Sequence, residues 1–281
     1  MKVCILGVGK MGSALAVGIA RGSGRDFGAW SQNPEGEIAR GRGAQLTLCD
    51  HSHAKAAALA RKTGAGVAKT AKQAVEGADA IIIAVKPDAT AALLEEIQKE
   101  LGETLIISVV AGLPMSYYKK RVPRSCRVAL IMSNLAVQIG KGTTMYYAES
   151  HVDAKEIEAL LAPTGAVIRA RKEEDIDFAM LTGSGMAFFL AAIEGMAKAG
   201  EMHGLTYAQA LTLSAKAAEG AGALVLEKEI KPLELEKMVA TKKGITLQGL
   251  RILRKAKVKH HFHRAAHAVI MDAKRRRKKN R

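Results

Sequence analysis

The stretch VCILGVGKMG, residues 3–12, decides how the first half of the chain folds. A short apolar run, residues 3–6, leads into the pattern Gly7-x-Gly9-x-x-Gly12, and apolar residues then recur at helical spacing. A strand, a glycine-rich turn and a helix in this order are typical of a βαβ unit that binds a dinucleotide. The first glycine allows the tight turn, the second leaves room for the pyrophosphate, and the third lets helix and strand pack closely. The cofactor-binding residues predicted here are Gly7, Gly9, Lys10, Met11 and Gly12.

Strand and helix patterns alternate through the first part of the chain. Further strands are expected at residues 44–49, 79–85, 104–110 and 167–170, with helices at 55–62, 71–76 and 89–101 between them. This alternation predicts a mostly parallel sheet with right-handed crossovers. After residue 171 only helical patterns follow, at 175–181, 187–203, 207–228, 233–240 and from 246 to near 274. We therefore predict a Rossmann-type α/β domain over residues 1–171, an all-α domain over 172–273, and a basic tail over 274–281.

The glycine-rich stretch between Gly22 and Gly43 leaves the position of the second strand open. It is either an insertion or contains the true second strand at residues 26–30. The usual spacing of about 20 residues from the glycine motif to the ribose-binding residue favours Ser31. The uninterrupted strand–helix–strand path from residue 44 to residue 85 favours Asp50, which we select.

Asp50, His51 and Ser52 are the predicted contacts to the adenosine half of the cofactor. An aspartate at the end of the second strand accepts hydrogen bonds from a ribose, which indicates NAD. The neighbouring His51, Ser52, His53 and Lys55 fit a 2′-phosphate equally well, so we favour NADP only slightly over NAD. Capping of the following helix is an alternative role for Asp50 and Ser52.

Composition indicates a two-domain globular protein. The chain has 281 residues, of which 48 % are hydrophobic, and this content excludes wholesale disorder. Its three cysteines lie far apart, which suggests neither a zinc cluster nor a disulfide framework and fits a reducing compartment. The apolar stretch 179–199 contains Glu194 and Lys198 and falls short of an uninterrupted membrane span. We expect a soluble, cytoplasmic protein without a membrane segment.

The net charge of +16 is concentrated near the C-terminus. Residues 251–281 contain 13 Lys and Arg against a single acid, Asp272, and so carry +12 of that charge. Residues 274–281 are most simply a solvated, self-repelling terminus. Nonspecific, salt-sensitive binding of nucleic acid or another polyanion by this tail is the alternative.

Several landmarks together resemble the pyrroline-5-carboxylate reductase family. They are Ala84-Val85-Lys86-Pro87 after one predicted strand, Ser108-Val109-Val110-Ala111-Gly112 after the next, Thr182-Gly183-Ser184-Gly185 before Ile193-Glu194, and Met238-Val239-Ala240-Thr241-Lys242-Lys243-Gly244-Ile245-Thr246 before the last helix. They occur in the family's order over nearly the whole chain.

The resemblance implies hydride transfer from NAD(P)H to the C=N carbon of a cyclic imino acid, giving proline. It implies that Ala84, Val85, Lys86, Pro87 and Asn134 belong to the cofactor pocket. The loop over residues 241–246 would hold the substrate carboxylate with backbone amides, through Thr241 and Gly244, and Thr246 would place its hydroxyl beside the ring nitrogen. The helical domain would pair with that of a second subunit, with the active site spanning the interface, so at least a homodimer is implied.

The sequence departs from the family pattern at three places. The substrate loop usually reads Ser-Pro-Gly-Gly-Thr-Thr, whereas Lys242 and Lys243 here replace the proline and the first glycine. A Pro-Asn-Thr-Pro turn keeps only its Asn134, and Met186 stands where a proline usually follows Gly-Ser-Gly. These changes bear on the identity of the substrate more than on the chemistry.

Two other functions stay open on the sequence. One is a related imine or hydroxyacid oxidoreductase with a different substrate. The other is a non-catalytic cofactor-binding protein whose basic tail binds polyanions. His263 and His267 stand four residues apart on one helical face, but the basic residues around them favour an exposed or interface position, and we predict no metal site.

Overall fold

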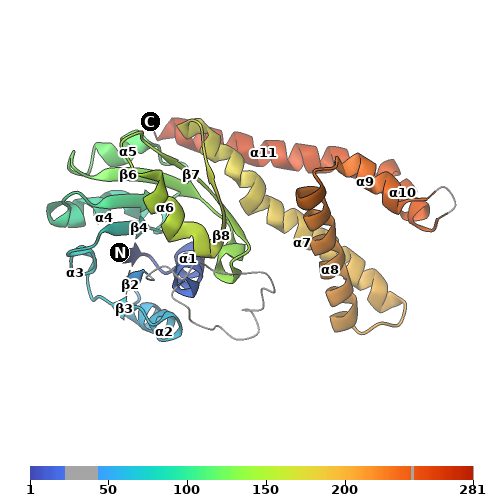
Figure 1. The fold of residues 1–281 in the computed structure, drawn as a ribbon, viewed down its shortest axis with the longest axis horizontal. Helices are drawn as coiled ribbons and strands as arrows, with labels where there is room; N and C mark the ends of the chain where they lie inside the picture. Colours follow the sequence, from blue (N-terminus) through green and yellow to red (C-terminus); the bar gives the residue numbers. More distant parts are fainter. Residues whose placement is uncertain (23–43, 242–243, 281) are drawn as a thin grey trace. The chain divides into compact units, whose positions relative to one another are not determined.

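The computed structural model describes residues 1–22, 44–241 and 244–280, and the chain forms two compact units (Figure 1). The first unit combines Met1–Gly183 with Ile270–Arg281, and the second is Ser184–Val269. The first unit thus extends beyond residue 171, because Ile176 and Ala179 pack with Ala170 and Met132 in a small core of their own. The stretch that contains Ser31 lies outside the described residues.

A single sheet organises the first unit. Its eight strands lie in the order β3-β2-β1-β4-β5-β6-β7-β8, and every neighbouring pair is parallel except β6 and β7. The predicted mostly parallel sheet is confirmed. The strands are β1 (Lys2–Leu6), β2 (Gln45–Cys49), β3 (Gly66–Val67), β4 (Ala80–Ile83), β5 (Leu105–Ser108), β6 (Arg127–Met132), β7 (Gly142–Ala148) and β8 (Gly165–Arg169).

Helices cover both faces of this sheet because its strands are apolar on both sides. One core joins Val3 and Ile5 of β1 to residues of α1, α2 and α6, and the other joins Cys4 and Leu6 to residues of α3, α4 and α5. The helices are α1 (Lys10–Arg21), α2 (His53–Thr63), α3 (Ala71–Val75), α4 (Thr90–Ile97), α5 (Met115–Lys119) and α6 (Ala154–Leu161), with short 3-10 turns η2 (Pro87–Ala89), η3 (Gln98–Glu100), η4 (Leu135–Ile139), η5 (Ala162–Thr164) and η6 (Glu173–Ala179).

In the described residues after η6, the regular elements are all helices, as predicted. They are α7 (Met180–Met202), α8 (Tyr207–Lys228), α9 (Pro232–Val239), α10 (Thr246–Lys255) and α11 (Val258–Lys279). The start of α8 is fixed by a capping box, in which Thr206 and Gln209 satisfy each other's backbone amides. The pattern that predicted one helix from residue 246 is divided into α10 and α11, because Lys257 takes a left-handed conformation with φ 51°.

The basic stretch 274–281 is not a solvated tail beyond the last helix, and that expectation was wrong. Helix α11 continues through Lys279, and Ile270–Arg281 belongs to the first unit. Arg277 is buried there and pairs with Asp177 at 3.0 Å. A buried guanidinium requires such carboxylate partners, and neither residue reveals the pairing by its position in the sequence.

One helical run is more apolar than the sequence analysis allowed. By length and composition alone, Glu173–Met202 is sufficient to cross a membrane, and only 22 % of its most apolar window is buried within the chain. A helix of a protein without membrane segments passes the same test when another subunit covers its apolar face.

Candidate active site

The candidate cofactor cradle lies at the carboxyl edge of the sheet, where β1, β2 and β4 end side by side. The amide of Gly7 donates a hydrogen bond to Cys49 O at 2.8 Å, and the amide of Ala84 donates to Leu6 O at 2.8 Å. These hydrogen bonds hold the glycine-rich turn between the ends of β2 and β4. The order of strands reverses between β1 and β4, which is where open α/β sheets bind dinucleotides.

The three glycines of the turn do different work. Gly7 has φ +98°, and a Cβ there would lie 2.8 Å from Ala84 O. A Cβ at Gly12 would lie 1.9 Å from Gly7 O, so both positions are closed by the protein itself. No described heavy atom lies within 4 Å of the Cβ position at Gly9. Space beside the backbone is therefore left open at the one glycine that is predicted to face the pyrophosphate.

Helix α1 begins directly after this open space. Gly9 is its N-cap residue and has no side chain to satisfy the first amides, which belong to Lys10, Met11 and Gly12. Ser13 is used inside the turn, since its hydroxyl donates to Val8 O at 2.8 Å. Free amides at a helix N-terminus, with the charge of Lys10 among them, suit the phosphates of a dinucleotide, so the residues present fit this cofactor.

Asp50 is held within the protein at the end of β2. Its Oδ2 accepts a hydrogen bond from the amide of Val8, and its Oδ1 accepts one from the amide of Ser52, both at 2.8 Å. His51 Nδ1 lies 3.0 Å from the same Oδ1, and the Asp50 side chain is only 8 % exposed. The carboxylate thus ties the glycine-rich turn to β2, a role that the sequence did not reveal. Its contact with a ribose stays a prediction.

Of the polar residues after Asp50, His51, His53 and Lys55 are exposed and Ser52 is half-buried. His51 has a side chain that is 91 % exposed, and His53 and Lys55 are also exposed. Ser52 is the N-cap residue of α2, but its hydroxyl makes no capping hydrogen bond in the described part of the chain. The structure therefore does not support side-chain capping as the role of Ser52.

The segment Ala84-Val85-Lys86-Pro87 follows β4 at the same edge. Lys86 O accepts hydrogen bonds from the Ala89 amide and the Thr90 hydroxyl, both at 3.1 Å, and Pro87 opens η2. The side chains of Lys86 and Pro87 are exposed, while Ala84 and Val85 are half-buried. The turn is thus fixed through the Lys86 carbonyl, while the Lys86 side chain is exposed.

Asn134 is buried at the start of η4 and is used by the chain itself. Its Oδ1 accepts from the Ala136 amide at 3.1 Å, and its Nδ2 donates to Thr182 O at 3.4 Å. Two of the family landmarks, the one at Asn134 and the one that begins with Thr182, are thereby connected. A contact between Asn134 and the cofactor stays a prediction.

The predicted substrate residues lie together in the second unit. Between α9 and α10, Thr241 O accepts a hydrogen bond from the Gly244 amide at 2.9 Å, and Thr246 is the first residue of α10. A Cβ at Gly244 would lie 2.6 Å from Thr241 Oγ1, so a larger residue there would displace the Thr241 side chain. Thr241 and Thr246 are exposed, and Lys242 and Lys243 lie outside the described residues.

An ion-pair cluster at the base of this loop was missed by sequence reasoning. Glu236 of α9 accepts from Arg254 of α10 at 2.6 Å and lies 2.9 Å from Lys259 Nζ of α11. Hydrogen bonds from Arg254 and Lys259 hold the pKa of Glu236 below its usual value. The three residues come from three helices, and their spacing follows no helical pair rule that would have identified them.

The cysteines and histidines give no sign of a second chemistry. Burial raises the pKa of the Cys4, Cys49 and Cys126 thiols, which keeps them protonated. The rings of His263 and His267 are 6.4 Å apart. Among residues 1–22, 44–241 and 244–280, no three His, Cys, Asp or Glu side chains gather as metal ligands.

Two family descriptions match the two parts of the chain. Residues 173–276 match "Pyrroline-5-carboxylate reductase dimerisation", and residues 2–112 match "NADP oxidoreductase coenzyme F420-dependent". Among solved structures, Plasmodium falciparum pyrroline carboxylate reductase with NADP bound has a TM-score of 0.82, at 24 % identity and over 99 % of this chain and 98 % of that one. At that identity the likeness shows the fold alone.

Relatives of similar length extend this agreement to the sequence. The pyrroline-5-carboxylate reductase of Aquifex aeolicus is 26 % identical over 90 % of this chain and 89 % of that protein. The pyrroline-5-carboxylate reductase of Methanosarcina acetivorans is 30 % identical over 278 residues, which are 98 % of this chain and 96 % of that protein. The chain therefore belongs to the pyrroline-5-carboxylate reductase family.

Proposed function

We propose that this protein reduces 1-pyrroline-5-carboxylate to L-proline with a nicotinamide cofactor. The observation that carries the proposal is the cradle between β1 and β4, where Gly7 and Gly12 are closed by the protein and Gly9 faces open space. In a chain of this family, such a cradle serves the cofactor that its relatives use. The predicted substrate loop supplies the second half of the chemistry.

The chain's own residues bind and orient more than they transfer protons. When bound, a reduced nicotinamide supplies the hydride. The amides that follow Gly9 hold the pyrophosphate, and the turn at Lys86 and Pro87 shapes the pocket beside it. Thr241 and Gly244 hold the substrate carboxylate, and the Thr246 hydroxyl hydrogen-bonds at the ring nitrogen.

The reaction itself requires little general-acid catalysis from the protein. A new C–H bond forms at the imine carbon, and the π electron pair of the C=N bond moves to nitrogen. If the imine is already protonated at nitrogen, that nitrogen accepts the pair and becomes the secondary amine of proline. Orientation within near-attack distance, about 3–3.5 Å, is the larger contribution that the protein makes. This agrees with a loop of hydroxyls and amides in place of a catalytic dyad.

We propose NADPH as the preferred cofactor. In support, both oxygens of the Asp50 carboxylate already accept backbone hydrogen bonds, which leaves it less suited to a ribose diol. The exposed His51, His53 and Lys55 offer donors and positive charge for a 2′-phosphate.

We also propose that the protein works in the cytoplasm as a homodimer or larger assembly. The family description that matches residues 173–276 names dimerisation. Large apolar side chains are exposed along α7 and α8, among them Phe189, Leu190, Met196, Leu213 and Leu226. Another subunit, and not a bilayer, is the cover that we propose for the apolar run Glu173–Met202. Three buried free thiols fit a reducing compartment.

A reductase assay with the cyclic imine and either cofactor tests the proposal. We expect turnover of 1-pyrroline-5-carboxylate, with kcat/KM higher for NADPH than for NADH. Turnover of other cyclic or acyclic imines in its place would identify a related imine reductase. Cofactor binding without any turnover would identify a binding protein.

A further inference from the structure

Arg277 is buried in the most basic part of the chain. Its side chain is 4 % exposed, whereas that of Arg275, two residues earlier, is 80 % exposed. Both residues stand on α11, so helical character alone does not explain the difference. A guanidinium is removed from water only where strong partners replace its hydration.

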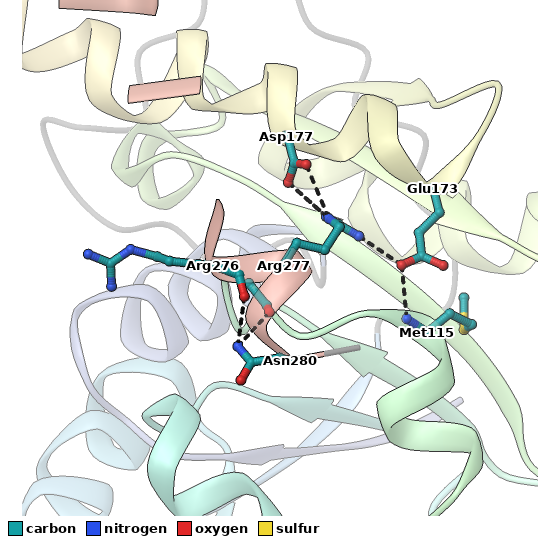
Figure 2. Close-up of polar contacts among 7 residues, drawn as sticks. Met115, Glu173, Asp177, Arg276, Arg277 and Asn280 are labelled. Carbon is teal, nitrogen blue, oxygen red and sulfur yellow. Dashed lines mark hydrogen bonds and ion pairs between the residues drawn. The ribbon is translucent and has the colours of Figure 1, made fainter. Parts of the chain in front are cut away.

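Two acidic residues at the start of the helical region provide those partners. Arg277 Nε and Nη2 each donate to Asp177 Oδ1 at 3.0 Å, and Nε also donates to Oδ2 at 3.2 Å. Arg277 Nη1 donates to Glu173 Oε1 at 2.9 Å. Figure 2 shows the guanidinium between the two carboxylates. A forked, charge-assisted arrangement of this kind fixes geometry as well as adding energy.

The same group of residues holds the loop after β5 at Gly112 and, at the end of that loop, the first residue of α5, Met115. Glu173 Oε1 also accepts a hydrogen bond from the Met115 amide at 3.1 Å (Figure 2). Asn280 Nδ2 donates to Gly112 O at 2.9 Å. Gly112 has φ +80°, and a Cβ there would lie 3.0 Å from the Cβ of Arg276. The last turn of α11 therefore rests directly on the loop.

This loop lies on one side of the proposed cofactor cradle. Strand β5 pairs with β4, and the loop over residues 109–114 leaves the same edge of the sheet as the turn at Lys86 and Pro87. In a dinucleotide fold the adenosine half lies toward the end of β2, so the nicotinamide half lies on the opposite side, over β4 and β5. The loop that Arg277 secures is thus placed beside the reactive half of the cofactor.

We propose that Arg277 is a positioning residue, which through Glu173, and with Asn280 behind it, fixes the loop 109–114 as a wall of the nicotinamide site. The inference rests on the proposed function for the identity of the cofactor. The role of Arg277 in ordering the loop is independent of the proposed function, because the order of the loop is a property of the protein without ligand. The proposal also gives a structural role to the charge of Arg277, which the sequence analysis placed in a basic tail.

Three variants and one control test the proposal. Arg277→Met removes the ion pairs, Arg277→Lys keeps the charge without the fork, and Asn280→Ala removes the contact to Gly112 from an exposed side chain. Arg275→Met is the control, because it removes an exposed charge from the same helix. Hydrogen exchange of the cofactor-free protein reports the loop, binding of NADPH by fluorescence reports the site, and kcat and KM report the reaction.

We expect Arg277→Met and Asn280→Ala to raise exchange over residues 109–115 while the central strands keep their protection. NADPH binding should weaken by about tenfold in Arg277→Met and by about threefold in Asn280→Ala, with Arg277→Lys between the parent and Arg277→Met. Arg275→Met should match the parent in every readout.

Unchanged exchange at residues 109–115 and unchanged NADPH affinity in Asn280→Ala and Arg277→Lys would overturn the proposal, whatever happens to thermal stability. Those two variants decide the question even where Arg277→Met fails to fold. A parent protein that binds NADPH but does not turn over the cyclic imine would contradict the proposed function alone. Hydrogen exchange and NADPH affinity would still test the role of Arg277.

Discussion

At the scale of single residues, the glycine-rich turn contains two positions that the protein itself closes and one that it leaves open. Gly7 and Gly12 meet neighbouring backbone at less than 3 Å from the Cβ that they lack, whereas Gly9 meets no described atom. The sequence motif predicted all three, and the family order of landmarks predicted the surrounding segments. What it could not give is the use of Asp50 by the backbone of Val8, because that contact exists only once β1 and β2 are paired.

Gly9→Val should leave the fold intact and weaken cofactor binding by about 100-fold, because the branched side chain fills space intended for the pyrophosphate. Circular dichroism and thermal unfolding check the fold, and fluorescence titration with NADPH checks the affinity. Gly12→Ala is the matched control: its added methyl meets Gly7 O, so we expect a loss of stability. Unchanged NADPH affinity in Gly9→Val would remove the motif from the site.

Thr246→Val keeps the volume of the side chain and removes its hydrogen bond to the substrate nitrogen. An unpaired polar partner costs about 1–3 kcal/mol, which corresponds to a fall in kcat/KM of about ten- to a hundredfold. Cofactor affinity should be preserved. Thr241→Val should act mainly through KM, because the carboxylate is bound equally in ground and transition states. Steady-state kinetics with the cyclic imine separate the two, and a parental rate in Thr246→Val would withdraw the loop assignment.

At the scale of elements, the Glu236 cluster joins three helices around the proposed substrate loop. Glu236→Gln should loosen α9 against α10 and raise KM for the imino acid by about two- to fivefold, which is the range expected of an ion pair near the protein surface. Arg251→Gln, on the same helix as Arg254 but outside the cluster, is the control. An unchanged KM in Glu236→Gln would show that the loop does not depend on this cluster.

The same cluster predicts a pH dependence. Arg254 and Lys259 lower the pKa of Glu236 in the folded protein, so its stabilising contribution is fully present above the unfolded value of about 4.3. It is lost as the pH falls through the lowered folded value. Thermal unfolding between pH 2.5 and 7 should show a steeper acid limb for the parent than for Glu236→Gln. Parallel acid limbs would contradict this assignment.

Elements with a strong local signal were predictable, and the remainder depended on pairing. Helix α8 has the predicted bounds because the capping box at Thr206 and the left-handed residue Glu229 fix both ends within the local sequence. Strands β6 and β7 were missed. An apolar run as short as Arg127–Met132 does not distinguish strand from helix, and β7 alternates only because one of its faces packs on the core.

At the scale of the whole molecule, exposed apolar surface predicts self-association. Phe189 on α7 and Leu213 on α8 are each 62 % exposed. Extensive exposed apolar surface is typical of an interface with another chain. We expect a mass by light scattering of at least twice the 29.9 kDa of one chain. Leu213→Glu should shift the protein toward monomer, and Lys216→Gln on the same helix should not. A monomeric parent would contradict the proposed assembly.

The two units are interleaved in the chain, which neither the composition nor the periodicity of the sequence indicated. In the sequence, residues 274–281 resemble a tail because the run of basic residues has no acidic residue within it. The acidic partners of Arg277 lie on another part of the chain. Long-range ion pairs of this kind have no spacing rule. They can be found only when the fold brings the segments together.

That interleaving sets an order on biosynthesis. Asp177 and Arg277 are 100 positions apart, and all of Ser184–Val269 lies between them. A growing chain releases its N-terminal parts first, so Asp177 and Glu173 leave the ribosome long before the arginine that neutralises them. Until translation has passed the second unit, the loop at Gly112 lacks the helix that rests on it. A ribosome stalled anywhere between residues 184 and 269 would therefore carry a sheet whose carboxyl edge is still unfinished.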